Sequence, residues 1–198
     1  MERAALRAGR PRSAITLIAV TKKFPPQVIL DAYALGLRHF GENYVQEFEA
    51  KHVAVAHLAD AAFYLIGHLQ SNKARVAASL FHSIQTVDSE RLARRLNDSV
   101  DPARPPLAVM IEVKLSAEAA KAGAAPAALP ALIDAIRACP RLDLTGLMTM
   151  PPWSEDPEET RPYFRKLAAL AKAERRSASQ MAVILLEEAL AARGKAKG

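Results

Sequence analysis

The chain has 198 residues, of which 51% are hydrophobic, so it is long enough for one domain of ordinary size with a short appendage. Its single cysteine, Cys139, excludes an internal disulfide and a zinc site built on cysteine pairs, and it fits a reducing compartment. No apolar run reaches the length of a membrane span, and no apolar segment follows the basic residues at the N-terminus. We therefore expect a cytoplasmic protein without a membrane segment.

The net charge of +6 is confined to the C-terminal end of the chain. Residues 161–198 contain nine Lys or Arg and three Glu, whereas basic and acidic residues balance in the part before them. We therefore expect a main domain at residues 1–160 and a basic helical tail at residues 161–198. Such a basic segment is either a solvated surface or a contact for an anionic partner.

Short apolar runs alternate with segments of helical periodicity along the chain. Residues 15–20 (ITLIAV) are rich in β-branched side chains, and Pro25-Pro26 then opens a helical pattern that ends at Gly36. Residues 107–113 (LAVMIEV) are apolar on both alternating faces, as in a strand that is covered on both sides of a parallel sheet. We expect strands at 15–20, 38–40, 63–67, 83–87, 107–113 and 144–150, with helices between them.

Six β/α units in succession predict a parallel α/β fold. Their short and even spacing favours a (β/α) barrel of the TIM type over an open doubly wound sheet. In such barrels the chemistry is placed where strands end and helices begin. The residues after the predicted strands are mostly polar: Thr21, Lys22, Lys23, Gly41, Glu42, Asn43, His68, Gln70, Ser71, Asn72, Lys73, Asp88, Lys114, Ser116 and Thr149.

Lys22 directly follows the first predicted strand, on the strand face shared by Ile18 and Val20. Partial desolvation at such a position favours the neutral amine, which can attack an aldehyde. The alternative is a side chain that lies along the sheet and keeps its ammonium group in water.

Six segments resemble the pyridoxal 5′-phosphate (PLP) homeostasis family in their order and approximate spacing. They are AVTKKFP (19–25), FGENYVQE (40–47), LIGHLQSNKARV (65–76), VDSERLARRLN (87–97), EAAKAG (118–123) and GLMTM (146–150). The resemblance covers about residues 5–170. It implies a barrel like the N-terminal domain of alanine racemase, PLP as cofactor, and a regulator or carrier of PLP without an established catalytic reaction.

The resemblance also implies roles for individual residues. Lys22 would hold the cofactor as a Schiff base, and Lys23 would not. Asn43 would bond to the hydroxyl group of the cofactor ring, Ile66 would pack on the pyridine face, and Met148 would line the ring. The residues themselves leave open a helix N-cap for Asn43 and plain core packing for Ile66. Further positions that match the family, with less defined roles, are Glu42, Lys73, Asp88 and Lys121.

The chain departs from the family pattern in two places. Tyr64 stands where the family has His, which argues against a proton relay there and leaves a packed aromatic side chain. Beyond about Leu170 the sequence does not match the seventh and eighth strands, which in the family bind the cofactor phosphate and face the pyridine nitrogen. We therefore expect an incomplete barrel of six strands with open edges, a C-terminal helix pair, and weakened binding of PLP.

The tail has a weaker resemblance to a different class of protein. Residues 166–194 resemble the two helices of ribbon-helix-helix DNA-binding proteins, but the acidic SEDPEET segment before them would be repelled by phosphates. Binding of nucleic acid is therefore disfavoured. The apolar run within 181–190, or the open barrel edges, could instead pair with a second copy of the chain.

Two further alternatives remain open. The first is a racemase-like enzyme, which would need a second acid/base group on the opposite face of the cofactor ring, and we identify no Tyr or Cys for that role. The second is a truncated family member that has lost its function. No metal site is predicted, because the histidines at positions 39, 52, 57, 68 and 82 lack diagnostic spacing.

Overall fold

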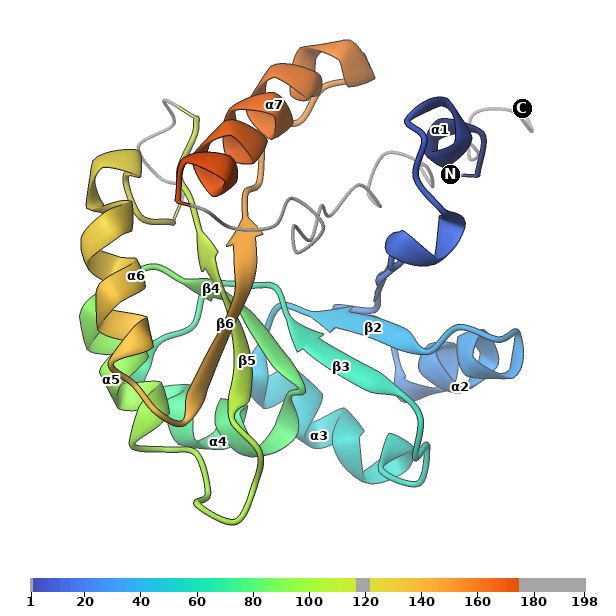
Figure 1. The fold of residues 1–198 in the computed structure, drawn as a ribbon. Helices are drawn as coiled ribbons and strands as arrows, with labels where there is room; N and C mark the ends of the chain where they lie inside the picture. The colour runs from blue at the N-terminus through green and yellow to red at the C-terminus, as the bar shows by residue number, and fades with distance from the viewer. Residues whose placement is uncertain (1, 117–121, 175–198) are drawn as a thin grey trace.

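The computed structural model describes residues 2–116 and 122–174, in which six strands form one sheet (Figure 1). The strand order is β1-β2-β3-β4-β5-β6, and every neighbouring pair is parallel. The predicted parallel α/β fold is therefore confirmed. Within the described residues β1 and β6 are the two edges, so this sheet is not closed. The strands are β1 (Ala19–Val20), β2 (His39–Glu42), β3 (Ala62–Leu65), β4 (Ser83–Val87), β5 (Leu107–Glu112) and β6 (Leu142–Met148).

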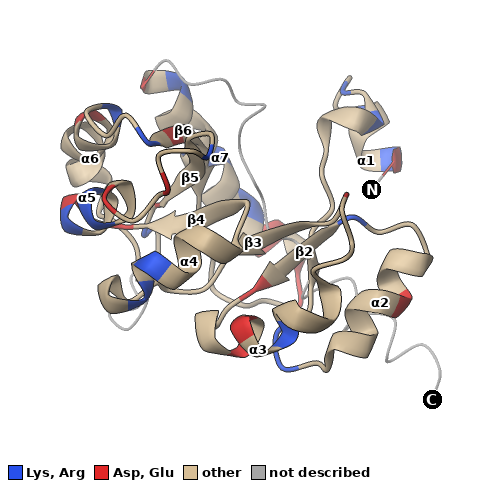
Figure 2. Ribbon diagram, turned by 90° about the horizontal axis from the view of Figure 1, so that it is seen from below, with Lys and Arg blue, Asp and Glu red and all other residues tan. Residues whose placement is uncertain are grey.

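Five helices connect the strands and lie in an arc along one face of the sheet (Figure 2). This arrangement follows from the parallel order of the strands, because each connection must return to the end of the sheet at which the strands begin. The helices are α2 (Pro26–Ala34), α3 (Val45–Val55), α4 (Ala74–Leu80), α5 (Glu90–Asn97) and α6 (Leu129–Arg137), and the short 3₁₀ turns η2 (Ser71–Lys73) and η3 (Pro126–Ala128) precede α4 and α6.

The helix boundaries follow local sequence signals. Pro26 is the first residue of α2, where its missing amide costs no hydrogen bond, and Gly36 has a positive φ of 93° just beyond the helix end. Ser89 caps α5, since its side chain accepts a hydrogen bond from the amide of Leu92 at 3.4 Å. The bounds of α2 agree with the helical pattern predicted between Pro25-Pro26 and Gly36.

Two strands differ from their predicted bounds. The first strand was expected at 15–20, but β1 comprises only Ala19–Val20, because an edge strand has a single partner and the ladder begins where Ala19 pairs with Phe40. A short 3₁₀ turn, η1 (Arg12–Ala14), lies before it. The sixth strand begins two residues earlier than expected, because Leu142 pairs with the first residue of β5, Leu107.

The main core lies between the sheet and the arc of helices. Phe48 of α3 is fully buried there, with its ring centroid 4.7 Å from that of Phe63 and 4.9 Å from that of Phe81. Phe40 of β2 stacks on Phe63 with a centroid separation of 5.8 Å. Aromatic rings from β2, α3, β3 and the end of α4 therefore join the second and third β/α units into one packed layer.

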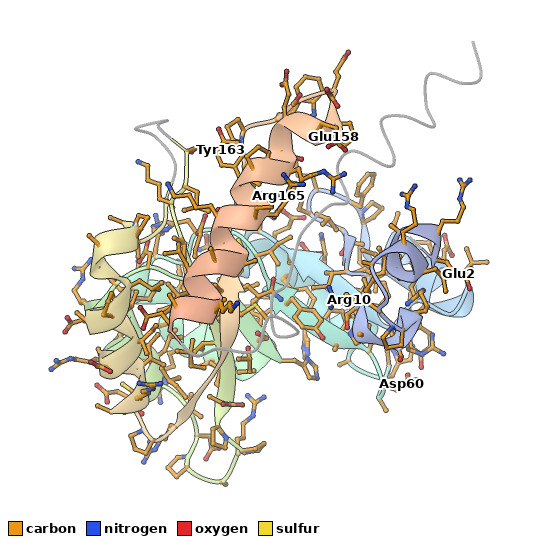
Figure 3. All side chains as sticks on the ribbon, turned by 45° about the horizontal axis from the view of Figure 1, so that its top comes forward. Glu2, Arg10, Asp60, Glu158, Tyr163 and Arg165 are labelled. Atoms are coloured by element: carbon orange, nitrogen blue, oxygen red, sulfur yellow. The ribbon has the colours of Figure 1, made fainter. Side chains whose placement is uncertain are left out.

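The two terminal helices lie outside the arc. The first is α1 (Glu2–Arg7), which precedes the first strand. The last, α7 (Pro157–Ala173), buries Leu167 and Ala171 in the main core, while the part of this helix that carries Glu158, Tyr163 and Arg165 extends beyond the sheet (Figures 1 and 3).

Some predictions fall outside the described residues. Lys121 and the second half of the tail, residues 175–198, are among them, so the helix pair and the resemblance to DNA-binding proteins stay predictions, as does the division of the chain at residue 160. Among residues 2–116 and 122–174, no helix is both long and apolar enough to cross a membrane.

Removal of the central core ring should strongly destabilise the fold. We expect Phe48→Ala to lower the free energy of unfolding by about 3–5 kcal/mol, because it deletes a fully buried aromatic side chain and leaves a cavity. The measurement is urea denaturation followed by circular dichroism. Val53→Ala on the same helix is the control, since Val53 is exposed and should change the free energy by less than about 0.5 kcal/mol. Equal effects of the two substitutions would contradict this description of the core.

Candidate functional site

The strands present two faces, and the face opposite helices α2 to α6, here called the inner face, carries two of the predicted site residues, Ile66 and Met148. A Cβ atom at Gly41 would lie 2.9 Å from Cδ1 of Ile66 and 3.1 Å from Cγ2 of Ile18, so these residues share one face. Ile66 and Met148 are both buried, yet neither belongs to the core cluster under the helices. Since their neighbours Leu65 and Leu147 do belong to that cluster, strand alternation places Ile66 and Met148 on the inner face.

Lys22 lies in a tight turn at the carboxyl end of β1. The amide of Phe24 donates a hydrogen bond to the carbonyl oxygen of Thr21 at 3.2 Å, which closes a four-residue turn with Lys22 at its second position. Lys23, at the third position, has a φ of 64°, as this turn geometry requires. Lys22 is half-buried and Lys23 is exposed.

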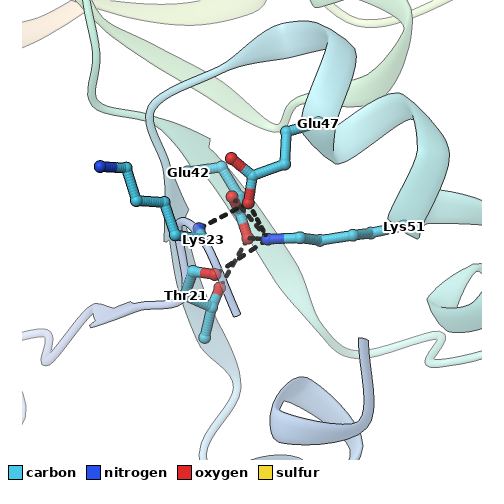
Figure 4. A network of polar contacts seen from close by, with 5 residues as sticks. All are labelled: Thr21, Lys23, Glu42, Glu47 and Lys51. Carbon is cyan, nitrogen blue, oxygen red and sulfur yellow. Dashed lines mark hydrogen bonds and ion pairs between the residues drawn. The ribbon is translucent and has the colours of Figure 1, made fainter. Parts of the chain in front are cut away.

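A buried ionic network lies directly behind this turn (Figure 4). The ammonium group of Lys51 donates to the carbonyl oxygen of Thr21 at 2.9 Å and to the two carboxylate oxygens of Glu42 at 3.1 and 3.2 Å. It also forms an ion pair with Glu47 at 2.6 Å. The hydroxyl group of Thr21 donates to Glu42 at 2.8 Å, and the carboxylate of Glu47 accepts the amide of Lys23.

The two carboxyl groups of this network have opposite pKa shifts. Burial raises the pKa of Glu42, although hydrogen bonds from Thr21 and Lys51 and the charge of Lys51 favour its ionised form. Burial also opposes ionisation of Glu47, but hydrogen bonds from Lys51 and from the Lys23 amide, with the charges of both lysines, hold the pKa of Glu47 below its usual value.

Asn43 follows β2 and does not cap the next helix. Tyr44 is the N-cap residue of α3, and no side chain bonds to the first amides of that helix. The Oδ1 atom of Asn43 is buried and has no hydrogen-bond partner among the described residues. Its backbone is fixed by Gly67, where a Cβ atom would lie 2.3 Å from the carbonyl oxygen of Asn43. Asn43 thus offers a buried acceptor for which residues 2–116 and 122–174 provide no donor.

Other polar groups lie on β2, β3 and β4, and two of them, His39 and Ser83, are the first residues of their strands. Nδ1 of His39 lies 2.9 Å from the hydroxyl oxygen of Tyr64, and burial raises the pKa of Tyr64. The packed aromatic expected at Tyr64 therefore has a polar partner, which the sequence analysis did not identify. On β4, Ser83 Oγ and Gln85 Oε1 are buried, and neither has a hydrogen-bond partner within the described part of the chain. Buried polar atoms that lack a hydrogen-bond partner are uncommon in folded proteins. Where they do occur, they are often found at binding sites.

Two acidic residues meet at the carboxyl ends of β4 and β5. Burial, together with the nearby charge of Asp88, raises the pKa of Glu112 to about 7. Asp88 also lies 3.4 Å from Nδ1 of His68, which forms an ion pair when the ring is protonated. Asp88 was a predicted site position, whereas Glu112 was not, because it falls inside an otherwise apolar strand segment. That single acidic residue within LAVMIEV is the sequence signal that could have identified it.

Glu112 should make stability depend on pH. The folded chain keeps this proton up to a pKa of about 7, whereas the unfolded chain releases it near 4.5, so the folded state binds more protons between these values. The free energy of unfolding should therefore fall by at most about 3 kcal/mol as the pH rises from 4.5 to about 7. We expect Glu112→Gln to remove this slope and to stabilise the protein at pH 8.

Urea denaturation across this pH range tests the prediction. Glu49→Gln is the control, because Glu49 is an exposed residue of α3 and its substitution should leave the slope unchanged. A slope that persists in the Glu112→Gln variant would show that another group is responsible.

No metal centre is evident in residues 2–116 and 122–174, since no three His, Cys, Asp or Glu side chains there could together hold a metal ion. The carboxyl ends of the strands instead combine a lysine, an amide acceptor and apolar side chains. Such a set suits an organic ligand with a polar ring substituent.

Comparison with known proteins defines the class first. Residues 6–184 match the family model of the alanine racemase N-terminal domain. Alanine racemase from Clostridium difficile 630 has a similar fold, with a TM-score of 0.67 at 11% identity over 91% of this chain and 49% of that one. The chain, with its parallel β/α architecture and a lysine after the first strand, therefore belongs to the alanine racemase N-terminal domain class.

More similar proteins narrow this class. The pyridoxal phosphate homeostasis protein of Pseudomonas aeruginosa is 43% identical over 148 residues, which cover 75% of this chain and 64% of that protein. The homologue with the same name from Vibrio cholerae is 40% identical over 177 residues, which cover 86% and 73%. The chain thus belongs to the pyridoxal phosphate homeostasis protein family, as the sequence motifs indicated, and the match spans about two-thirds of the length of these relatives.

A solved structure supports this assignment. PipY from Synechococcus elongatus is 37% identical and has a TM-score of 0.78, covering 91% of this chain and 83% of its own. A second PipY structure, with a TM-score of 0.77, contains bound PLP.

Proposed function

We propose that this chain binds PLP in intracellular PLP homeostasis, with Lys22 as the residue that bonds covalently to the cofactor. The observation that carries the proposal is the position of Lys22, half-buried in a turn at the carboxyl end of β1 and at the same end of the parallel sheet as Asn43, Ile66 and Met148. The PLP bound in the PipY structure supports the same ligand class.

The residues present fit this cofactor. Asn43 offers a buried acceptor that has no donor from the described protein, and a ring hydroxyl group would supply one. Ile66 and Met148 offer buried apolar surface on the inner face, suitable for contact with an aromatic ring. A purely apolar ligand would leave the buried acceptor of Asn43 without a donor. A flat aromatic ligand with a polar group at its edge would supply the donor and still bury its ring, so the site favours that kind of ligand.

PLP supplies an aldehyde, which condenses with a primary amine to a Schiff base with loss of one water molecule. Lys22 is the amine in this proposal, because Lys23 is exposed and Lys51 is bound by three acceptor groups. We assign the chain a binding and carrier role rather than a catalytic one. A reducing compartment such as the cytoplasm suits its single cysteine, since Cys139 is buried as a free thiol.

Chemical trapping tests the role of Lys22. After incubation of the full chain with PLP, reduction with borohydride and peptide mass spectrometry, we expect the modification on Lys22. Lys22→Ala should abolish the visible absorption band of the adduct, because no other lysine occupies the same position. A band of unchanged strength in Lys22→Ala would overturn the assignment.

Lys23→Asn is the matched control. Asn tolerates the positive φ of this position, so the turn should be kept while the neighbouring amine is removed. The band should persist in this variant, and circular dichroism should show that both variants are folded.

A further inference from the structure

The network behind β1 anchors the backbone on both sides of Lys22. Before it, the carbonyl oxygen of Thr21 accepts from Lys51 at 2.9 Å and from the amide of Phe24 at 3.2 Å. After it, the amide of Lys23 donates to the carboxylate of Glu47. The residue that would bond to PLP is therefore held between two peptide groups that are themselves tied to β2 and α3 (Figure 4).

We propose that Lys51 is a positioning residue for Lys22, and that with Glu42 and Glu47 it clamps the Thr21–Phe24 turn so that Lys22 is held ready to bond to the cofactor. This proposal rests on the proposed function for its ligand and extends it to three residues that do not need to touch PLP.

The energetic cost of the arrangement supports a role in the site. Lys51 is only 6% exposed and Glu42 is fully buried, and removal of two charges from water is expensive even when they are paired. Lys23 adds backbone strain, since it is the one non-glycine residue with positive φ in the described ranges. Both costs fall on the turn that carries Lys22, and strain of this kind gathers at functional sites.

Lys51 is also kept from reacting itself. An ammonium group has three N–H donors, and Lys51 has three acceptor groups around it, namely the Thr21 carbonyl and the carboxylates of Glu42 and Glu47. The protonated nitrogen has no lone pair with which to attack an aldehyde. The clamp therefore separates a structural ammonium group from the reactive amine of Lys22.

The first test measures the turn without any cofactor. In Lys51→Met, which keeps an unbranched side chain one atom shorter and removes the charge, we expect the amides of Lys23 and Phe24 to exchange with deuterium at least about tenfold faster. Amides of α4 and α5 should be unchanged. Unchanged protection of both turn amides would overturn the proposal, whatever the chain does with PLP.

The second test measures the reaction of Lys22. A loosened turn misplaces the amine, so the rate of adduct formation with PLP should fall by about a hundredfold in Lys51→Met. Non-covalent binding of PLP by Lys22→Ala should be the same with and without Lys51→Met, because positioning matters only when Lys22 is present. An equal loss of affinity in both backgrounds would show a general structural role and overturn the proposal.

Two further variants complete the design. Lys172→Met removes an exposed lysine of α7 and should leave both measurements unchanged. If Lys51→Met does not fold, Glu47→Gln serves instead, since it leaves the Lys51–Glu42 pair intact and should still speed exchange at Lys23 and slow adduct formation. Failure of the unsubstituted chain to form an adduct would disprove the proposed function, while the exchange measurement would still decide whether the clamp exists.

Discussion

Parallel pairing of the strands is the constraint on which the site depends. It brings the carboxyl ends of all six strands to one end of the sheet. Residues that are far apart in sequence therefore lie at that same end of the sheet, namely Lys22, Asn43, Ile66 and Met148. The helices lie along the other face and bury the aromatic core there. The inner face is thus left for buried side chains that do not serve the main core.

Much of this arrangement could be predicted from the sequence, because it depends on local patterns. The β-branched runs, the Pro25-Pro26 helix start and Gly36 identified the first β/α unit, and the lysine after the first strand stood out by its place in the pattern. The boundaries of β1 and β6 were less accurate, because the length of a strand depends on where its neighbour begins.

The clamp was beyond sequence reasoning for a different reason. Helical spacing shows that Glu47 and Lys51 can pair, yet an i,i+4 pair on a helix is usually a weak surface contact. Only the packing of α3 against β1 and β2 buries this pair and adds a backbone carbonyl from another unit. Glu112 was missed similarly, since its altered protonation arises from burial and from Asp88 on the adjacent strand end.

Gly67 limits how this site can change over evolution. A methyl group there would overlap the backbone of Asn43, so even alanine would force β3 and the loop after β2 apart. The outer surface of the helices has no such restriction, since residues such as Val53 and Leu35 are exposed. Homologous sequences should therefore diverge freely around the periphery and keep glycine at this crossing. Position 67 is thus a marker for members that preserve the close approach of β3 to the backbone of Asn43.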